Sequence, residues 1–245
     1  SVASRGLGDV YKRQVIPCYN NKKYIRTTVN SALNQDYAPK EVIVVNDGST
    51  EDIRSELNDL ISYGKISYFE KDNGGVSSAR NYGIEMSRGK YILTLDSDDI
   101  ILEDTISSLF EVNGDNENVI VSPWLTYFGD DNPSVWKPSP PTNSIIHHNN
   151  TPSSSLYSKR LWSIIGGYDE NMKKGYEDWE FWIRMYLIKA EFKVCPKHLF
   201  LYRRNYRPDR LSASQESNHT EILNYILSKH KGHFYGNLSI EIIDR

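Results

Sequence analysis

Apolar positions between residues 15 and 100 change repeatedly between the spacing of a strand and the spacing of a helix. The continuous β-branched run at 42–45 is typical of a parallel strand that is covered on both faces. Apolar residues at helical spacing precede and follow this run, as on the buried face of an amphipathic helix. The predicted elements are strands at 15–17, 42–45, 66–69 and 91–95 and helices at 25–33, 53–61 and 76–87.

Polar residues follow each of these predicted strands: Asn20, Asp47, Asn73 and Asp96 in chain order. Strand–helix repeats with short links form right-handed crossovers, which predicts an α/β fold with a Rossmann-like, mostly parallel sheet flanked by helices. In such sheets ligands bind beyond the carboxyl ends of the strands. The pattern therefore predicts a binding site at the edge where these four residues meet.

The alternation becomes less regular after residue 100. The stretch at 130–151 is rich in Pro, Ser and Asn and is long enough to suggest a binding loop. No internal repeat and no linker composition divides the chain. The predicted elements are helices near 106–110, 159–165, 177–190 and 221–231 and strands at 119–121, 192–195 and 199–203.

The first fourteen residues fit neither period. The segment 4–14 resembles the translation of a transposase sequencing adaptor joined in frame to a gene fragment, with a genuine polar extension as the alternative. We therefore expect 1–14 to be an artefactual segment. On this interpretation 15–17 is the tail of a strand whose first half has been replaced.

Composition excludes several functional classes. A net charge of −3 lacks the basic excess of a nonspecific nucleic-acid clamp, so no nucleic-acid partner is expected. No apolar run approaches the ~20 residues of a membrane-spanning helix, which leaves at most peripheral contact. Ile222, Tyr225 and Ile226 could make such contact, although helix packing is the favoured interpretation. Only two distant cysteines, Cys18 and Cys195, are present, which fits a location in the cytoplasm or at the inner face of the membrane.

Two acidic motifs are candidates for chemistry. Asp96-x-Asp98 follows an apolar strand, and Mg²⁺ or Mn²⁺ prefers carboxylate oxygens together with substrate phosphates. The alternative is a solvated turn that caps the helix after it. Glu177-Asp178 lies at a helix start among aromatic residues, where a carboxylate can act as a general base. The alternative there is stabilisation of the helix dipole alone.

The motifs together resemble the family 2 glycosyltransferases of the GT-A fold over about residues 15–212. The resemblance rests on an ordered set: Pro17-Cys18-Tyr19-Asn20, Asn46-Asp47-Gly48-Ser49, Asn73-x-Gly75, Ala79-Arg80-Asn81, Asp96-Ser97-Asp98-Asp99, Gly166-Gly167-Tyr168-Asp169 and Glu177-Asp178-Trp179. It implies a nucleotide-sugar half at 15–100, an acceptor half at 101–212 and a helical tail at 213–245.

The resemblance also implies a role for each motif. Donor-binding residues would be Pro17, Tyr19, Asp47, Asn73, Gly75, Arg80 and Asp96. Asp98 would hold Mg²⁺ or Mn²⁺ on the diphosphate, Asp178 would be the base supported by Glu177, and Trp179 would contact the acceptor. The implied reaction is inverting transfer of one sugar from a nucleotide-sugar donor, with uracil as the expected base, to a glycan or lipid-linked acceptor in cell-surface polysaccharide synthesis.

Departures from the family pattern leave alternatives open. Asn205 stands where many members carry a histidine, so a third metal ligand is not defined. The Gln-x-x-Arg-Trp segment of processive synthases is absent from the sequence, which favours single-sugar transfer. The alternatives are an inactive glycosyltransferase-like fragment, or a nucleotidyltransferase or phosphatase that uses the Asp-x-Asp site.

Overall fold

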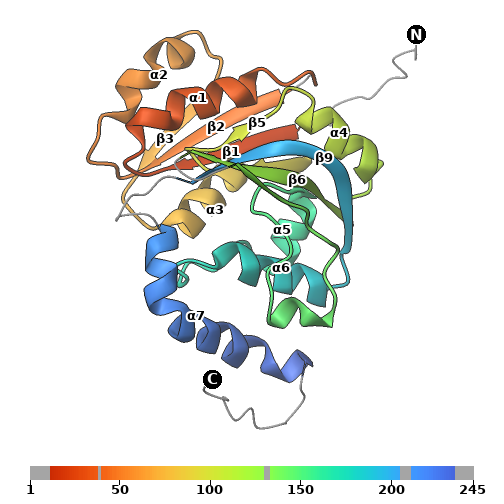
Figure 1. The fold of residues 1–245 in the computed structure, drawn as a ribbon. Coiled ribbons are helices and arrows are strands. Elements are labelled where there is room, and N and C mark those ends of the chain that lie inside the picture. Colours follow the sequence, from red (N-terminus) through yellow and green to blue (C-terminus); the bar gives the residue numbers. More distant parts are fainter. Residues whose placement is uncertain (1–11, 38–39, 130–132, 205–210, 235–245) are drawn as a thin grey trace, which may run out of the picture.

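A computed structural model describes residues 12–37, 40–129, 133–204 and 211–234. The described strands form one sheet in the order β3-β2-β1-β4-β8-β6-β9-β5, and β7 pairs with β6 beside this path. Figure 1 shows α1 and α2 on one side of the sheet and α3, α5 and α6 on the other, with α7 beyond α6. The α/β fold class is therefore confirmed.

The first half of the chain is the regular one. Its elements are β1 (Lys12–Cys18), α1 (Lys22–Leu33), β2 (Lys40–Asp47), α2 (Ile53–Ser62), β3 (Ser67–Lys71), α3 (Val76–Met86) and β4 (Tyr91–Thr94). These four strands pair in parallel, as the strand–helix alternation predicts. Successive residues of β2 point to opposite faces and both faces are buried, which explains the continuous apolar run.

The second half is mixed. Its elements are β5 (Ile100–Ile101), α4 (Thr105–Asn113), β6 (Val119–Gly129), β7 (Ser134–Trp136), the 3₁₀ helix η1 (Asn143–Ile146), β8 (Leu156–Ser158), α5 (Lys159–Ile165), α6 (Glu177–Leu187), β9 (Glu191–Arg204) and α7 (Leu211–Phe234). Strand β8 is antiparallel to both of its neighbours, so β6 runs in the same direction as β4. Parallel pairing in this half occurs between β6 and β9.

Strand β9 corrects one expectation. The sequence predicts two short strands at 192–195 and 199–203, but one strand spans both and pairs with β6 along its length. The register shifts at Pro123–Leu125, opposite the segment that contains Pro196. A bulge accommodates a residue that cannot donate to the ladder, so the proline bends the strand without ending it.

Strand β1 begins inside the segment that we expect to be artefactual. Lys12 and Gln14 are fully buried, and the Lys12 ammonium lies 3.4 Å from the ring centres of Tyr37 and Phe110. Burial lowers the pKa of Lys12 to about 8. Among the described residues, the side-chain amide of Gln14 has no hydrogen-bond partner. The strand therefore carries polar groups at core positions, and residues 1–11 lie outside the described part.

The C-terminal helix is part of the packed domain. Helix α7 begins at Leu211, before the tail boundary expected at 213. Ile222 and Ile226 are buried in the same hydrophobic cluster as Trp182 of α6, which confirms packing as their role. Tyr225 instead is exposed, and its hydroxyl donates to Asp169. No helix in the described ranges is long and apolar enough to cross a membrane. Cys18 and Cys195 are buried free thiols.

Candidate active site

The parallel strands end at one edge of the sheet, and Asp47 organises the loops there. At the end of β2 its carboxylate accepts hydrogen bonds from Lys71 Nζ (2.8 Å), Gly74 N (3.0 Å) and Gly75 N (2.8 Å). The side chain of Asn73 donates to the Asp47 carbonyl oxygen at 2.9 Å. Asp47 is buried, and these contacts fix the loop 73–75 against the end of β2.

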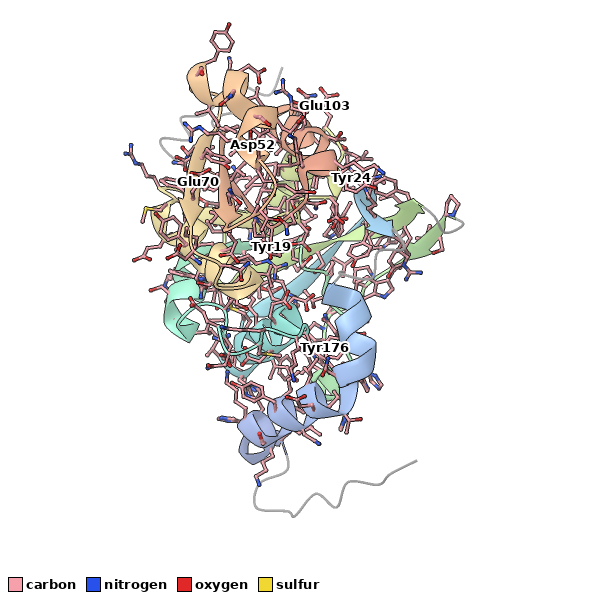
Figure 2. All side chains as sticks on the ribbon, turned by 90° about the vertical axis from the view of Figure 1, so that its left-hand side faces the viewer. Tyr19, Tyr24, Asp52, Glu70, Glu103 and Tyr176 are labelled. Atoms are coloured by element: carbon pink, nitrogen blue, oxygen red, sulfur yellow. The ribbon has the colours of Figure 1, made fainter. Side chains whose placement is uncertain are left out.

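Two further expected donor residues lie at the end of β1. Pro17 is buried, whereas the Tyr19 side chain is 52% exposed. Figure 2 shows Tyr19 near the middle of this side of the molecule, and Tyr176 lies below it beside α7. An exposed ring at the carboxyl edge of a parallel sheet can stack on a planar ligand group.

Arg80 joins the two acidic motifs. It lies on α3, and its guanidinium donates through Nη2 to Asp96 and through Nη1 to Glu177, both at 2.7 Å. The Arg80 side chain is buried, and its guanidinium lies 5.2 Å from the ring centre of Tyr168. Asp96 and Glu177 are far apart in the sequence, so this bridge places the Asp-x-Asp motif beside the start of α6.

The end of β9 reaches the same motif. The Arg203 side chain donates from Nε to the Asp98 carbonyl oxygen (2.8 Å), and its backbone N–H donates to Asp99 Oδ1 (2.7 Å). Its guanidinium lies between the rings of Tyr24 and Phe128, 4.4 and 4.3 Å from their centres. Arg203, at the end of β9, is therefore a neighbour of Asp98.

The acidic residues at this edge suit a cation that is coordinated partly by the protein and partly by the diphosphate of a bound nucleotide. Asp98 is half-buried, and the carboxylate of its neighbour Asp96 is engaged by Arg80. Among the described residues, no group of three or more His, Cys, Asp or Glu could hold a metal ion. One carboxylate plus diphosphate oxygens is a donor set that Mg²⁺ accepts. Asn205, the uncertain third ligand, lies outside the described residues.

Asp178 is the acid with the most unusual environment. It is half-buried on the first turn of α6, where it accepts hydrogen bonds from Asn149 Nδ2 (3.3 Å) and Trp179 N (2.7 Å). Burial, and then the negative charge of Glu177, raises the pKa of Asp178 to about 7. The charge of Asp96 adds to this rise in pKa, so the two motifs share one electrostatic environment. A carboxylate with such a pKa can accept a proton near neutral pH.

The two neighbours of Asp178 are placed differently. Glu177 is buried and paired with Arg80, which fits a supporting role. The Trp179 side chain is only 4% exposed, and its indole N–H donates to the Ile145 carbonyl at 2.5 Å. Trp179 therefore belongs to the hydrophobic core here, which speaks against an open acceptor platform at this ring. The half-buried aromatic residue beside Asp178 is Tyr176.

Sequence reasoning did not identify two polar partners at this site. Asn149 contacts Asp178, and the only signal for it was its position inside the 130–151 stretch that we interpreted as a binding loop. Lys71 pairs with Asp47, whereas its position near the Asn73 loop favours a solvated charge, with a phosphate contact as the alternative. Both contacts depend on how separate loops meet, which residue spacing does not show.

Comparison with known proteins identifies the family. The family model described as Glycosyl transferase family 2 matches residues 14–206, which is most of the chain. The chain therefore belongs to glycosyl transferase family 2. An uncharacterized glycosyltransferase of Rickettsia typhi is 32% identical over 196 residues, covering 73% of this chain and 59% of the relative.

Other relatives show how much of a larger protein this chain represents. The chondroitin synthase of Pasteurella multocida is 29% identical over 233 residues, covering 88% of this chain and 23% of the synthase. Across the curated relatives compared, the chain spans from 16% to 59% of their length. The crystal structure of S. aureus TarS 1-349 in complex with UDP-GlcNAc has a TM-score of 0.68 at 19% identity, covering 93% of this chain and 74% of TarS 1-349. This likeness confirms the GT-A fold.

Proposed function

We propose that this chain transfers a single sugar, with inversion, from a UDP-linked sugar to a hydroxyl group of a glycan or lipid-linked acceptor. The observation that carries the proposal is the Arg80 bridge, because one buried guanidinium contacts both the Asp-x-Asp motif and the acids at the start of α6. Sugar transfer needs the groups that bind the donor and the base that activates the acceptor to face one cavity. A bridge that holds Asp96 and Glu177 close together supports such an arrangement.

The donor base would bind at the ends of β1 and β2. Asp47 accepts three hydrogen bonds from the described residues, and a carboxylate has about four acceptor positions, which leaves room for the imide N–H of a uracil. Pro17 and Tyr19 would cover the faces of the base, and the loop at 73–75 would close beside it. Asp96 would contact the ribose with one carboxylate oxygen while Arg80 donates to the other.

Asp98 would hold Mg²⁺ or Mn²⁺ against the diphosphate. When bound, the cation neutralises charge that accumulates on the departing diphosphate. The protein's own contribution is a half-buried carboxylate at a rigid strand end, tied to β9 by the Arg203 contact with the Asp98 carbonyl. Loss of this carboxylate should weaken nucleotide binding mainly when the metal is present.

Asp178 would act as the base. The acceptor O–H proton moves to the Asp178 carboxylate as that oxygen attacks the anomeric carbon, and the bond from this carbon to the diphosphate oxygen breaks. The diphosphate leaves with the electron pair, so proton and charge are both accounted for. The negative charge of Glu177 favours proton uptake by Asp178, and the ion pair with Arg80 keeps the Glu177 side chain in place.

A titration of UDP against the purified chain, with and without Mn²⁺, tests the proposal. We expect Mn²⁺ to increase UDP affinity in the wild type and D98A to abolish this increase. The matched control D59A removes an exposed aspartate that pairs with Arg26 on the helices above the sheet. Metal-independent UDP binding, or an unchanged Mn²⁺ effect in D98A, would count against the assignment of Asp98.

A panel of UDP sugars then defines the donor. UDP-GlcNAc is the first probe because a TarS structure with the same fold contains it. Product analysis by mass spectrometry distinguishes addition of one sugar from polymerisation. A ladder of products longer than one added sugar would contradict single-sugar transfer while leaving the donor site intact.

A further inference from the structure

Helix α7 carries no recognised motif, yet its polar residues contact the segment that leads into the catalytic acids. The contacts are Tyr176–His219 (2.9 Å), Lys174–Glu221 (2.6 Å), Asp169–Tyr225 (2.6 Å), Asp169–Lys229 (2.5 Å), Glu180–Lys229 (2.8 Å) and Glu180–His230 (3.0 Å). They run along several turns of one helix and reach both sides of Asp178. Figure 1 shows α7 lying against the α6 side of the molecule.

The contacts of Lys229 and His230, near the C-terminal end of α7, belong to a buried charged cluster. Glu180 is fully buried, and Arg184 pairs with it from the same helix while Lys229 and His230 reach it from α7. Burial alone would raise the pKa of Glu180, but hydrogen bonds from His230 and Arg184 outweigh it and lower the pKa to about 2. A buried carboxylate with this many donors fixes α7 against α6.

The contact between His219 of α7 and Tyr176 involves a residue with a strained backbone. Tyr176 adopts the left-handed conformation (φ 59°, ψ 17°) immediately before α6. A bulky residue rarely adopts this conformation, so the surrounding structure must hold it there. The Tyr176 hydroxyl bonds to His219 Nδ1, and its ring packs edge-on against the rings of His219 and Trp179.

We propose that His219 and Tyr176 are positioning residues for Asp178, with α7 acting as the support that fixes the backbone at the start of α6. The inference rests on the proposed function, because it assigns the base role to Asp178. Since Asp178 is two residues after Tyr176, the backbone angles at Tyr176 set the direction in which the Asp178 carboxylate points. The same turn aims Glu177 at Arg80.

Substitutions at His219 separate positioning from general stability. H219F keeps an aromatic ring and removes the hydrogen-bonding Nδ1, whereas H219N places a polar amide group near the position of Nδ1. The matched control is H233F, because His233 is another exposed histidine of α7. The readout is hydrolysis of UDP-GlcNAc with Mn²⁺, in which water replaces the acceptor and still needs a base.

We expect H219F to lower kcat by about tenfold or more, since small displacements of a catalytic group have effects of this size. KM for UDP-GlcNAc should stay within about twofold, H219N should recover most of the rate, and H233F should resemble the wild type. An unchanged kcat in H219F overturns the proposal, and so does a parallel loss of UDP affinity and kcat. Failure of the proposed function would look different, because the wild type itself would neither bind UDP nor hydrolyse the sugar nucleotide.

A crystal structure of H219F gives a test that does not depend on turnover. The proposal predicts that Tyr176 leaves the left-handed region and that the Glu177–Arg80 contact changes. An unaltered backbone from Tyr176 to Asp178 would overturn it.

Discussion

The carboxylates on the proposed donor side and on the proposed acceptor side have different hydrogen-bond partners. On the donor side, Asp47 is paired with Lys71 and Asp96 with Arg80. On the acceptor side, no cation within the described ranges bonds directly to Asp178, which receives only an amide N–H and a backbone N–H. The cations hold the two paired carboxylates in place, whereas burial and the charge of Glu177 raise the pKa of Asp178. This difference supports the proposed division of roles, in which Asp47 and Asp96 bind the donor and Asp178 is the base.

Removing the acid of Asp178 should give the largest effect on activity. In D178N the side chain keeps its size and can still accept from Asn149, but it cannot take up a proton. Transfer should fall by about two to four orders of magnitude. UDP binding measured by calorimetry should be unchanged. Retained turnover in D178N would remove Asp178 from the role of base.

Removing the bridge between the two sides should give the largest effect on stability. R80M leaves buried Glu177 without its cation and frees Asp96, so we expect a loss of about 3–5 kcal/mol in the free energy of unfolding. Denaturant titration measures this. The control R26M removes an exposed arginine–aspartate pair and should shift the melting temperature by no more than about 2 °C. Equal effects of the two variants would contradict a buried bridge.

The raised pKa of Asp178 predicts a stability effect that depends on pH. The folded state binds this proton up to about pH 7, whereas the unfolded state releases it near pH 4. The stabilising contribution of the proton is therefore complete below the unfolded pKa and disappears as the pH rises through 7. D178N should melt at a higher temperature than the wild type at pH 8, by about 2–4 °C for each kcal/mol gained.

Thermal melts of both proteins between pH 5 and pH 8 measure this effect. The advantage of D178N should shrink steadily toward pH 5, where the wild-type carboxyl group is protonated. A constant difference across this range would mean that the Asp178 carboxyl group has an ordinary pKa.

The smallest expected effect concerns two buried glutamines. Gln14 of β1 is in register with Val42 and Leu93, and its amide is unsatisfied among the described residues. Gln35 is also buried, but it donates to Ser31 and Leu102 and accepts from Ile106. Q14L should therefore raise the free energy of unfolding by about 1–3 kcal/mol.

Q35L is the matched substitution and should lower the free energy of unfolding by a similar amount, since it removes three hydrogen bonds between the side chain and the backbone. Chemical denaturation compares the two variants. Destabilisation in both would show that Gln14 has a partner after all.

The sequence predicts which residues lie together at the strand ends better than it predicts the contacts at the start of α6, for a physical reason. Asp47 and Asp96 follow parallel strands, and strand ends meet at one edge whatever else the chain does. Arg80 instead depends on a contact across 97 positions of sequence with Glu177, which no local period reveals. Trp179 was expected to face an acceptor. Helix α6 lies between the sheet and α7, so most of its side chains, including Trp179, are buried.

The C-terminal half shows the same limit. The spacing of Ile222 and Ile226 predicts the buried face of a helix, and both residues are buried. The buried charge cluster at Glu180 was not predictable, because its members come from α6 and α7 and are all common surface residue types.

A crystal structure with UDP and Mn²⁺ tests the central claim most directly. The account predicts the uracil beside Asp47, the metal between Asp98 and the diphosphate, and the Asp178 carboxylate facing the β-phosphate across the same cavity. UDP bound away from Asp47, or an Asp178 carboxylate that opens onto a different surface from Asp98, would contradict it.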